Sequence, residues 1–161
     1  MKVTRKAGKI EALRETIKGL GDAQGRVGWF ESSKYENGAP VAGIAAVHEF
    51  GSPSRGIPPR PFMRTTATEK RGDWSKTAGA LTKAATNGNM DPKNIMAAVC
   101  MAAEGHVRET ITKLTAPALK KATIDARKRR LANGGKGAEA SIGKPLVDTG
   151  IMLDTLTSET D

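Results

Sequence analysis

The sequence predicts an α+β fold in which helices outnumber strands. The strongest pattern lies between residues 91 and 114, where apolar residues recur at spacings of three or four and so share one helix face. Two short segments, 25–31 and 156–160, have instead the alternation typical of strands. The apolar residues of the strongest helix are Ile95, Val99, Ala103, Val107, Ile111 and Leu114.

The first expected element is a helix over residues 8–20. Its apolar face is formed by Ile10, Leu13, Ile17 and Leu20. The strand over residues 25–31 follows, with Val27 and Trp29 on one face, and Asn37-Gly38 marks a turn.

The apolar run over residues 41–47 fits either a buried strand or a buried helix. Its alanine content and its continuation to Phe50 favour the helix. Pro40 suits the first turn of that helix, and Gly51 is the expected C-terminal cap. The loop over residues 52–60 should be stiff and extended, because prolines restrict their own φ and disfavour helical backbone before them.

Three further helices are predicted, over residues 61–85, 91–114 and 119–132. Asp91 should cap the second of them with Pro92 at its first position, after an interruption at 87–89. Pro117 separates the second from the third.

The last part of the chain begins with a Gly-, Ser- and Lys-rich loop around residues 133–145, which is predicted to be mobile. Asp148 is the predicted N-cap of a last short helix over residues 148–153, and the strand at 156–160 closes the fold. We expect residues 1–161 to form one domain.

The chain is strongly basic, with a formal charge of +9 and a pI near 9.9. This charge implies an acidic partner: nucleic acid, an anionic membrane or an acidic protein surface. Between residues 113 and 136 the only acid is Asp125. Two interpretations remain open here, an ordinary solvated helix face and a functional basic surface. The predicted surface, facing DNA or an acidic neighbour, comprises Lys120, Lys121, Arg127, Lys128, Arg129 and Arg130.

Membrane insertion and secretion are not expected from the sequence. No apolar run approaches the roughly 20 residues of a membrane span, and the basic segment 1–6 has no apolar region behind it, as a signal peptide would. The single cysteine, Cys100, excludes an intramolecular disulfide and lies in an apolar run typical of a buried side chain.

No catalytic, cofactor or metal constellation is readable. His48 and Glu49 are adjacent and point about 100° apart on a helix, and no HExxH pattern includes them. Cys100 and His106 lie on different faces of their helix, so they do not form a metal pair. We therefore expect a protein that is not an enzyme and that needs no cofactor.

The proline loop is the predicted docking edge. A preorganised loop loses little entropy on binding, and arginine and aromatic side chains are frequent interface anchors. The predicted interface residues are Arg55, Arg60, Phe62 and Arg64.

Three sequence blocks also carry a family likeness: HEFG at 48–51, IPPRPFMR at 57–64 and KPLVDTGIMLDTLT at 144–157. With VGWF at 27–30, they resemble the tail-completion proteins of tailed bacteriophages, also called neck or head–tail joining proteins. The resemblance implies a small mixed sheet of few strands packed against a long helix, in a subunit that assembles into a ring, for which it suggests a hexamer.

The same resemblance implies a virion structural protein at the head–tail junction, assembled in the host cytoplasm. Its partners would be further copies of itself, other connector, tail-terminator or tail-tube proteins, and packaged DNA through non-specific contacts. The alternative is a sequence-independent DNA-binding or packaging accessory protein. A third hypothesis, a tail-associated hydrolase, lacks a catalytic motif in this sequence.

Overall fold

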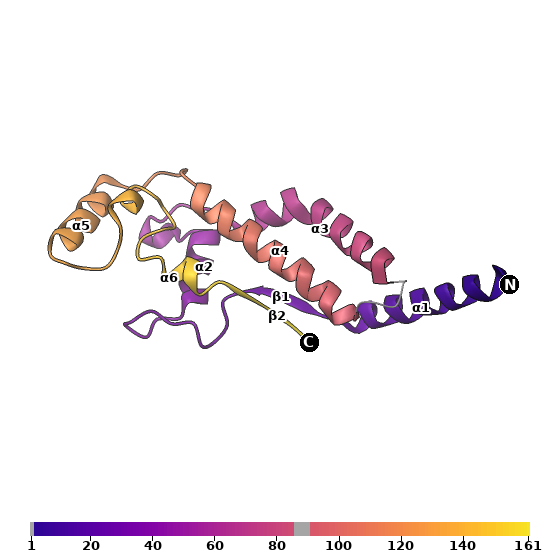
Figure 1. The fold of residues 1–161 in the computed structure, drawn as a ribbon. Coiled ribbons are helices and arrows are strands. Elements are labelled where there is room, and N and C mark those ends of the chain that lie inside the picture. The colour runs from indigo at the N-terminus through magenta and orange to yellow at the C-terminus, as the bar shows by residue number, and fades with distance from the viewer. Residues whose placement is uncertain (1, 86–90) are drawn as a thin grey trace. The chain divides into compact units, whose positions relative to one another are not determined.

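The computed structural model describes residues 2–85 and 91–161. Within them the chain forms mainly helices, with two short strands (Figure 1). In chain order the elements are α1 (Lys2–Asp22), β1 (Gly25–Gly28), α2 (Val41–Phe50), the 3-10 turn η1 (Pro53–Arg55), α3 (Met63–Ala85), α4 (Pro92–Lys113), α5 (Lys121–Ala132), the 3-10 turn η2 (Glu139–Ser141), α6 (Ile151–Asp154) and β2 (Thr157–Thr160). The interruption predicted at 87–89 lies outside the described residues.

The α+β class is confirmed, with a correction to the sheet. The described residues contain one sheet, made of β1 and β2, which is two-stranded and antiparallel and not mixed. The chain divides into two compact units. Unit 1 contains the described residues of 1–27, 69–105 and 157–161, and unit 2 contains 28–68 and 106–156.

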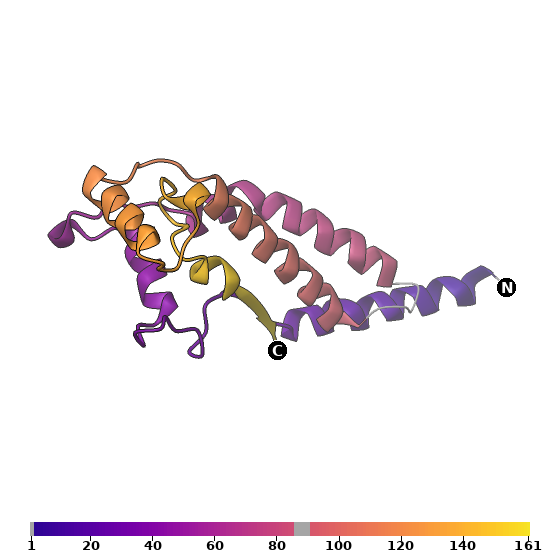
Figure 2. The ribbon, with the colours of Figure 1, turned by 60° about the vertical axis from the view of Figure 1, so that its left-hand side comes forward.

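Unit 1 combines α1, the sheet, and the parts of α3 and α4 that run side by side in both ribbon views (Figures 1 and 2). Its buried apolar residues include Ala85, Ile95, Cys100 and Ala103. The start of α4 is as predicted, since the Asp91 carboxylate accepts a hydrogen bond from the backbone N–H of Lys93 at 2.9 Å. Burial raises the pKa of the Cys100 thiol, as expected for a buried side chain.

The predicted apolar face of the first helix is only partly covered. Ile10 and Ile17 of α1 are 53% and 56% exposed, whereas Thr16 between them is buried. The hydrogen-bonding requirement of the Thr16 hydroxyl is met within the helix, because it donates to the backbone carbonyl of Ala12 at 2.8 Å. The periodicity therefore predicted the helix correctly, but not which side of it is buried.

Unit 2 is organised around Phe62, which is fully buried. The Trp29 ring meets the Phe62 ring edge-on, with centroids 5.8 Å apart, and its indole N–H donates to the Met152 carbonyl at 2.9 Å. The Thr66 hydroxyl lies 2.7 Å from the Thr110 hydroxyl and joins α3 to α4 within this unit. Other buried apolar residues here are Val41, Ala45, Val107, Ile111, Leu146, Met152 and Leu156.

Helix α2 ends as predicted at Gly51, whose φ of 77° lies in the left-handed region. A Cβ at this position would lie 2.8 Å from the backbone nitrogen of Pro59. Glycine therefore both ends the helix and lets the proline loop pass close behind it.

Candidate functional site

The HEFG and IPPRPFMR blocks meet at one buried carboxylate, that of Glu49 at the end of α2. It accepts hydrogen bonds from the backbone N–H groups of Phe62 at 2.8 Å, Met63 at 2.9 Å and Arg64 at 3.2 Å. The Arg64 side chain donates to the same carboxylate through Nε at 2.8 Å and to the Glu49 carbonyl through Nη2 at 3.0 Å. Glu49 is therefore the cap of α3, supplied from another helix.

Two opposing effects act on the pKa of Glu49. Burial alone would raise it, but the hydrogen bonds from the Arg64 side chain and from the three backbone amides together lower it below its ordinary value. The carboxylate is thus held in its charged form. Glu49 is thus a hydrogen-bonded side chain at the end of α2.

His48, the neighbouring residue of α2, makes a different set of contacts. Its carbonyl accepts the Arg60 N–H at 2.7 Å, which fastens the proline loop to the helix. Its Nδ1 is buried and has no hydrogen-bond partner among the described residues. Burial, followed by the nearby charges of Arg60 and Arg127, lowers the pKa of His48, so the imidazole is neutral near pH 7.

The prediction that Arg60 and Phe62 are presented to a partner is wrong. Arg60 is 4% exposed and Phe62 is fully buried, because both side chains turn into unit 2. The Arg60 guanidinium donates to the carbonyls of Pro117 at 2.8 Å and Ala118 at 3.2 Å. Arg55 and Arg64 do remain exposed.

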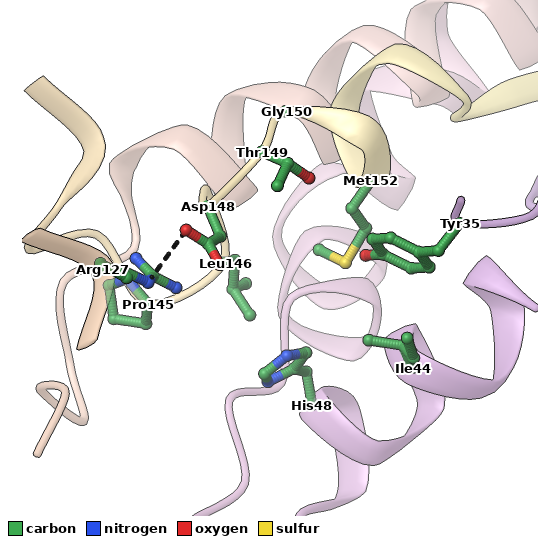
Figure 3. Close-up of a pocket in the computed structure, with 10 residues that line it drawn as sticks. All are labelled: Tyr35, Ile44, His48, Arg127, Pro145, Leu146, Asp148, Thr149, Gly150 and Met152. Atoms are coloured by element: carbon green, nitrogen blue, oxygen red, sulfur yellow. Dashed lines mark ion pairs between the residues drawn. The ribbon is translucent and has the colours of Figure 1, made fainter. Parts of the chain in front are cut away.

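Arg127 of α5 was also predicted to lie on the surface and is instead buried. Its Nη1 donates to the carbonyls of Ser141 at 3.2 Å, Ile142 at 3.2 Å and Lys144 at 2.7 Å. Its Nε lies 3.2 Å from Asp148 Oδ1, an ion pair without hydrogen-bond geometry (Figure 3). A buried guanidinium needs such partners, and the folded chain supplies them locally.

Asp148 does not cap the last helix, contrary to prediction. Its carboxylate pairs with Arg127 and, through two hydrogen bonds, with the half-buried Arg130. The N-cap of α6 is Gly150, without a side-chain cap. Two nearby guanidiniums outcompete the backbone amides for this carboxylate.

The predicted mobile loop at 133–145 is fastened at several points. Ser141 and Pro145 are buried, and Lys136 forms an ion pair with Glu36. The Arg127 guanidinium donates hydrogen bonds to three backbone carbonyls of this segment. Of the six residues of the predicted basic surface, Lys120, Lys121, Lys128 and Arg129 stay exposed, and Lys121 pairs with Asp125 at 2.9 Å.

Two cavities in unit 2 share His48, Arg127 and Pro145 in their walls. The first, of about 290 Å³, also contains Tyr35, Met152 and Asp148 (Figure 3). Burial and then the charge of Asp148 raise the pKa of Tyr35. The second, of about 340 Å³, lies between the proline loop and the start of α5, and we call it the basic cleft. Its basic lining residues are His48, Arg55, Arg60, Lys120 and Arg127.

Sequence reasoning did not anticipate the basic cleft. The signal that could have found it is the number of arginines and lysines in both the proline loop and the 119–132 segment, because segments of like charge repel each other when they pack together. In the part of the chain that the structure describes, no group of three or more His, Cys, Asp or Glu residues could hold a metal ion. None of the described helices is both long and apolar enough to cross a membrane.

Comparisons with known proteins give no relative. No protein-family model matches the chain, no curated protein is similar to it in sequence, and no solved structure resembles it.

Proposed function

We propose that this chain is a structural subunit of a phage head–tail connector, which joins the DNA-filled head to the tail as a ring around the DNA channel. The observation that carries the proposal is the convergence of the resembling blocks in unit 2. HEFG and IPPRPFMR meet at Glu49, the VGWF block contacts Phe62 through Trp29, and Trp29 also bonds to Met152 in the C-terminal block.

The hydrogen bonds of the buried polar side chains also favour a structural role. The buried polar groups of these blocks bind backbone groups of other segments: Glu49 binds amides, whereas Arg60 and Arg127 bind carbonyls. Such bonds fix the chain in one conformation. A connector subunit needs this rigidity, because it transmits contacts between neighbours that must meet in register.

The alternative function, sequence-independent DNA binding, is less well supported by the same contacts. Diffuse phosphate binding requires exposed cations. Of the six predicted surface residues, Arg127 is buried and Arg130 is engaged by Asp148. The remaining four include Lys121, which is paired with Asp125.

The test is the assembly state of the purified chain together with its role in the particle. Native mass spectrometry and negative-stain imaging should find a closed ring, and loss of the protein from the virus that encodes it should leave filled heads and separate tails. A monomer that binds duplex DNA at physiological salt, with normal joining of heads to tails in its absence, would support the accessory protein and reject the connector.

A further inference from the structure

The walls of the basic cleft carry a concentrated positive charge. Arg55 and Arg60 come from the proline loop, Lys120 and Arg127 come from α5 and its N-cap, and none of the lining residues is acidic. The Lys120 ammonium lies against Gly56, since a Cβ on that glycine would be 2.9 Å from Nζ. The lysine therefore reaches from the start of α5 to the proline loop, across the cleft.

These cations lack sufficient counter-charge within the chain. Arg55 and Lys120 form no ion pair with any described residue, and Arg60 Nη1 has no hydrogen-bond partner there. The carboxylate paired with Arg127, that of Asp148, is shared with Arg130. Burial, and after it the charge of Arg127, lowers the pKa of Arg60, which is the mark of two buried cations placed close together.

From this geometry we propose that the basic cleft binds an acidic peptide segment of a partner protein, with a carboxylate seated among Arg60, Arg55 and Lys120. A carboxylate would accept charge-assisted hydrogen bonds from the guanidinium and ammonium donors. It would also relieve the repulsion that the folded subunit carries on its own.

The size and walls of the cleft favour a peptide over a phosphate. At about 340 Å³ it has room for roughly ten waters, each taking about 30 Å³, which is far more than one oxyanion fills. Ile57, Pro58 and Leu119 supply apolar walls that fit an aliphatic side chain next to the acid. Duplex phosphates lie on a convex surface, whereas Arg60 is recessed and 4% exposed.

The chemistry of the ligand follows from the cleft alone, whereas its identity as a neighbouring connector or tail protein rests on the proposed function. The two can therefore fail separately. Peptide binding is measured on the isolated chain, and the connector role is measured by ring formation and head–tail joining.

The experiment uses isothermal titration calorimetry with the peptide acetyl-Leu-Glu-Glu-Leu-amide, its Gln-for-Glu analogue, inorganic phosphate and a 20-base-pair duplex. The Glu peptide should bind and the Gln peptide should not. The exposed double variant Arg55→Ala/Lys120→Ala should weaken binding about tenfold, because two rim charges are lost. The variant Lys128→Ala/Arg129→Ala removes the same charge from exposed α5 positions outside the cleft and should bind like wild type.

A second measurement locates the ligand. The chain has two histidines, and a carboxylate bound in the cleft should raise the pKa of His48 measured by NMR while leaving His106 as an internal reference. Equal weakening by both double variants would overturn the proposal, since it would indicate non-specific attraction. Binding of phosphate or duplex without binding of the Glu peptide, or an unchanged His48 titration, would overturn it as well.

Discussion

Glu49 is placed where the proline loop makes an acceptor necessary. Prolines 58, 59 and 61 have no N–H, and the Arg60 amide between them donates to the His48 carbonyl, so the first amides after Pro61 are those that open α3. These amides have no partner within the helix. The Glu49 carboxylate binds three of them and also pairs with the exposed guanidinium of Arg64.

Replacement of this carboxylate should change both stability and its pH dependence. Glu49→Gln should lower the free energy of unfolding at pH 7 by about 2 kcal/mol, because buried amides lose a charged acceptor. The folded pKa of Glu49 lies below its ordinary 4.5, so its stabilisation is present above that pH and is lost as the pH falls below it. Urea unfolding between pH 7 and 3 should therefore show a smaller loss of stability for the variant than for wild type. Parallel curves would contradict this account of Glu49.

The sequence predicted a stiff loop here, but not the direction in which its side chains point. Arg60 looks like a surface anchor because arginine is seldom buried. What buries it is a pair of carbonyls at Pro117 and Ala118, more than fifty residues away along the chain. Local patterns contain no information on such distant acceptors, so the interface prediction failed at Arg60 and Phe62. Of the four predicted interface residues, only Arg55 and Arg64 are exposed.

Phe62 should consequently behave as a core residue. Phe62→Ala should lower the free energy of unfolding by about 3–5 kcal/mol, because it leaves a cavity beneath Trp29. Urea unfolding followed by circular dichroism measures the effect. The control is Arg55→Ala, an exposed change in the same loop that should shift the curve by less than about 0.5 kcal/mol. A stable Phe62→Ala protein would contradict the core assignment.

At the scale of elements, periodicity and capping residues identified the helices well. Asp91 with Pro92 and the glycine at 51 marked true helix ends, because these signals act through bonds to neighbouring residues. The same rule failed at Asp148, which met all the local criteria for an N-cap. Its carboxylate is taken by Arg127 and Arg130, and tertiary ion pairs of this kind override local propensity.

Glycine in the middle of α3 should limit the stability of that helix. Gly79 has nothing within 4 Å of the position that a Cβ would take. Gly79→Ala should therefore raise the free energy of unfolding by about 0.5–1 kcal/mol, since alanine restricts the unfolded chain and favours the helix. Thermal melting by circular dichroism should show a higher midpoint, and an unchanged or lower one would contradict this.

Gly25 of β1 should respond in the opposite way. A Cβ there would lie 2.3 Å from Cys100 Sγ, so Gly25→Ala should destabilise unit 1, by about 1–3 kcal/mol for overpacking. Cys100→Ala removes that sulfur, and the double variant should be more stable than the sum of the two single changes predicts. A double-mutant cycle by urea unfolding measures this coupling; purely additive effects would show that the two positions do not touch.

The charge of the whole molecule bears on how copies could assemble. Each copy of the chain carries a formal +9, and the ion pairs at Asp148 and Asp125 lie within the chain and leave this net charge unchanged. Closing a ring would bring several such charges together, which self-repulsion opposes. Acidic partners, such as the peptide proposed for the basic cleft, would supply the missing counter-charge.

Formation of the proposed ring by the isolated chain should therefore increase with salt. Raising ionic strength from about 0.01 M to 0.15 M shortens the Debye length from about 30 Å to about 8 Å, which screens repulsion between exposed cations. Mass photometry should find more rings at the higher salt. Lys128→Glu/Arg129→Glu, at two exposed positions on α5, should shift assembly to lower salt, with Lys128→Gln/Arg129→Gln in between. Wild-type rings that dissociate as salt rises would mean instead that Lys128 and Arg129 of α5 bind acidic side chains of the neighbouring copy. The charge-reversed variant would then fail to assemble.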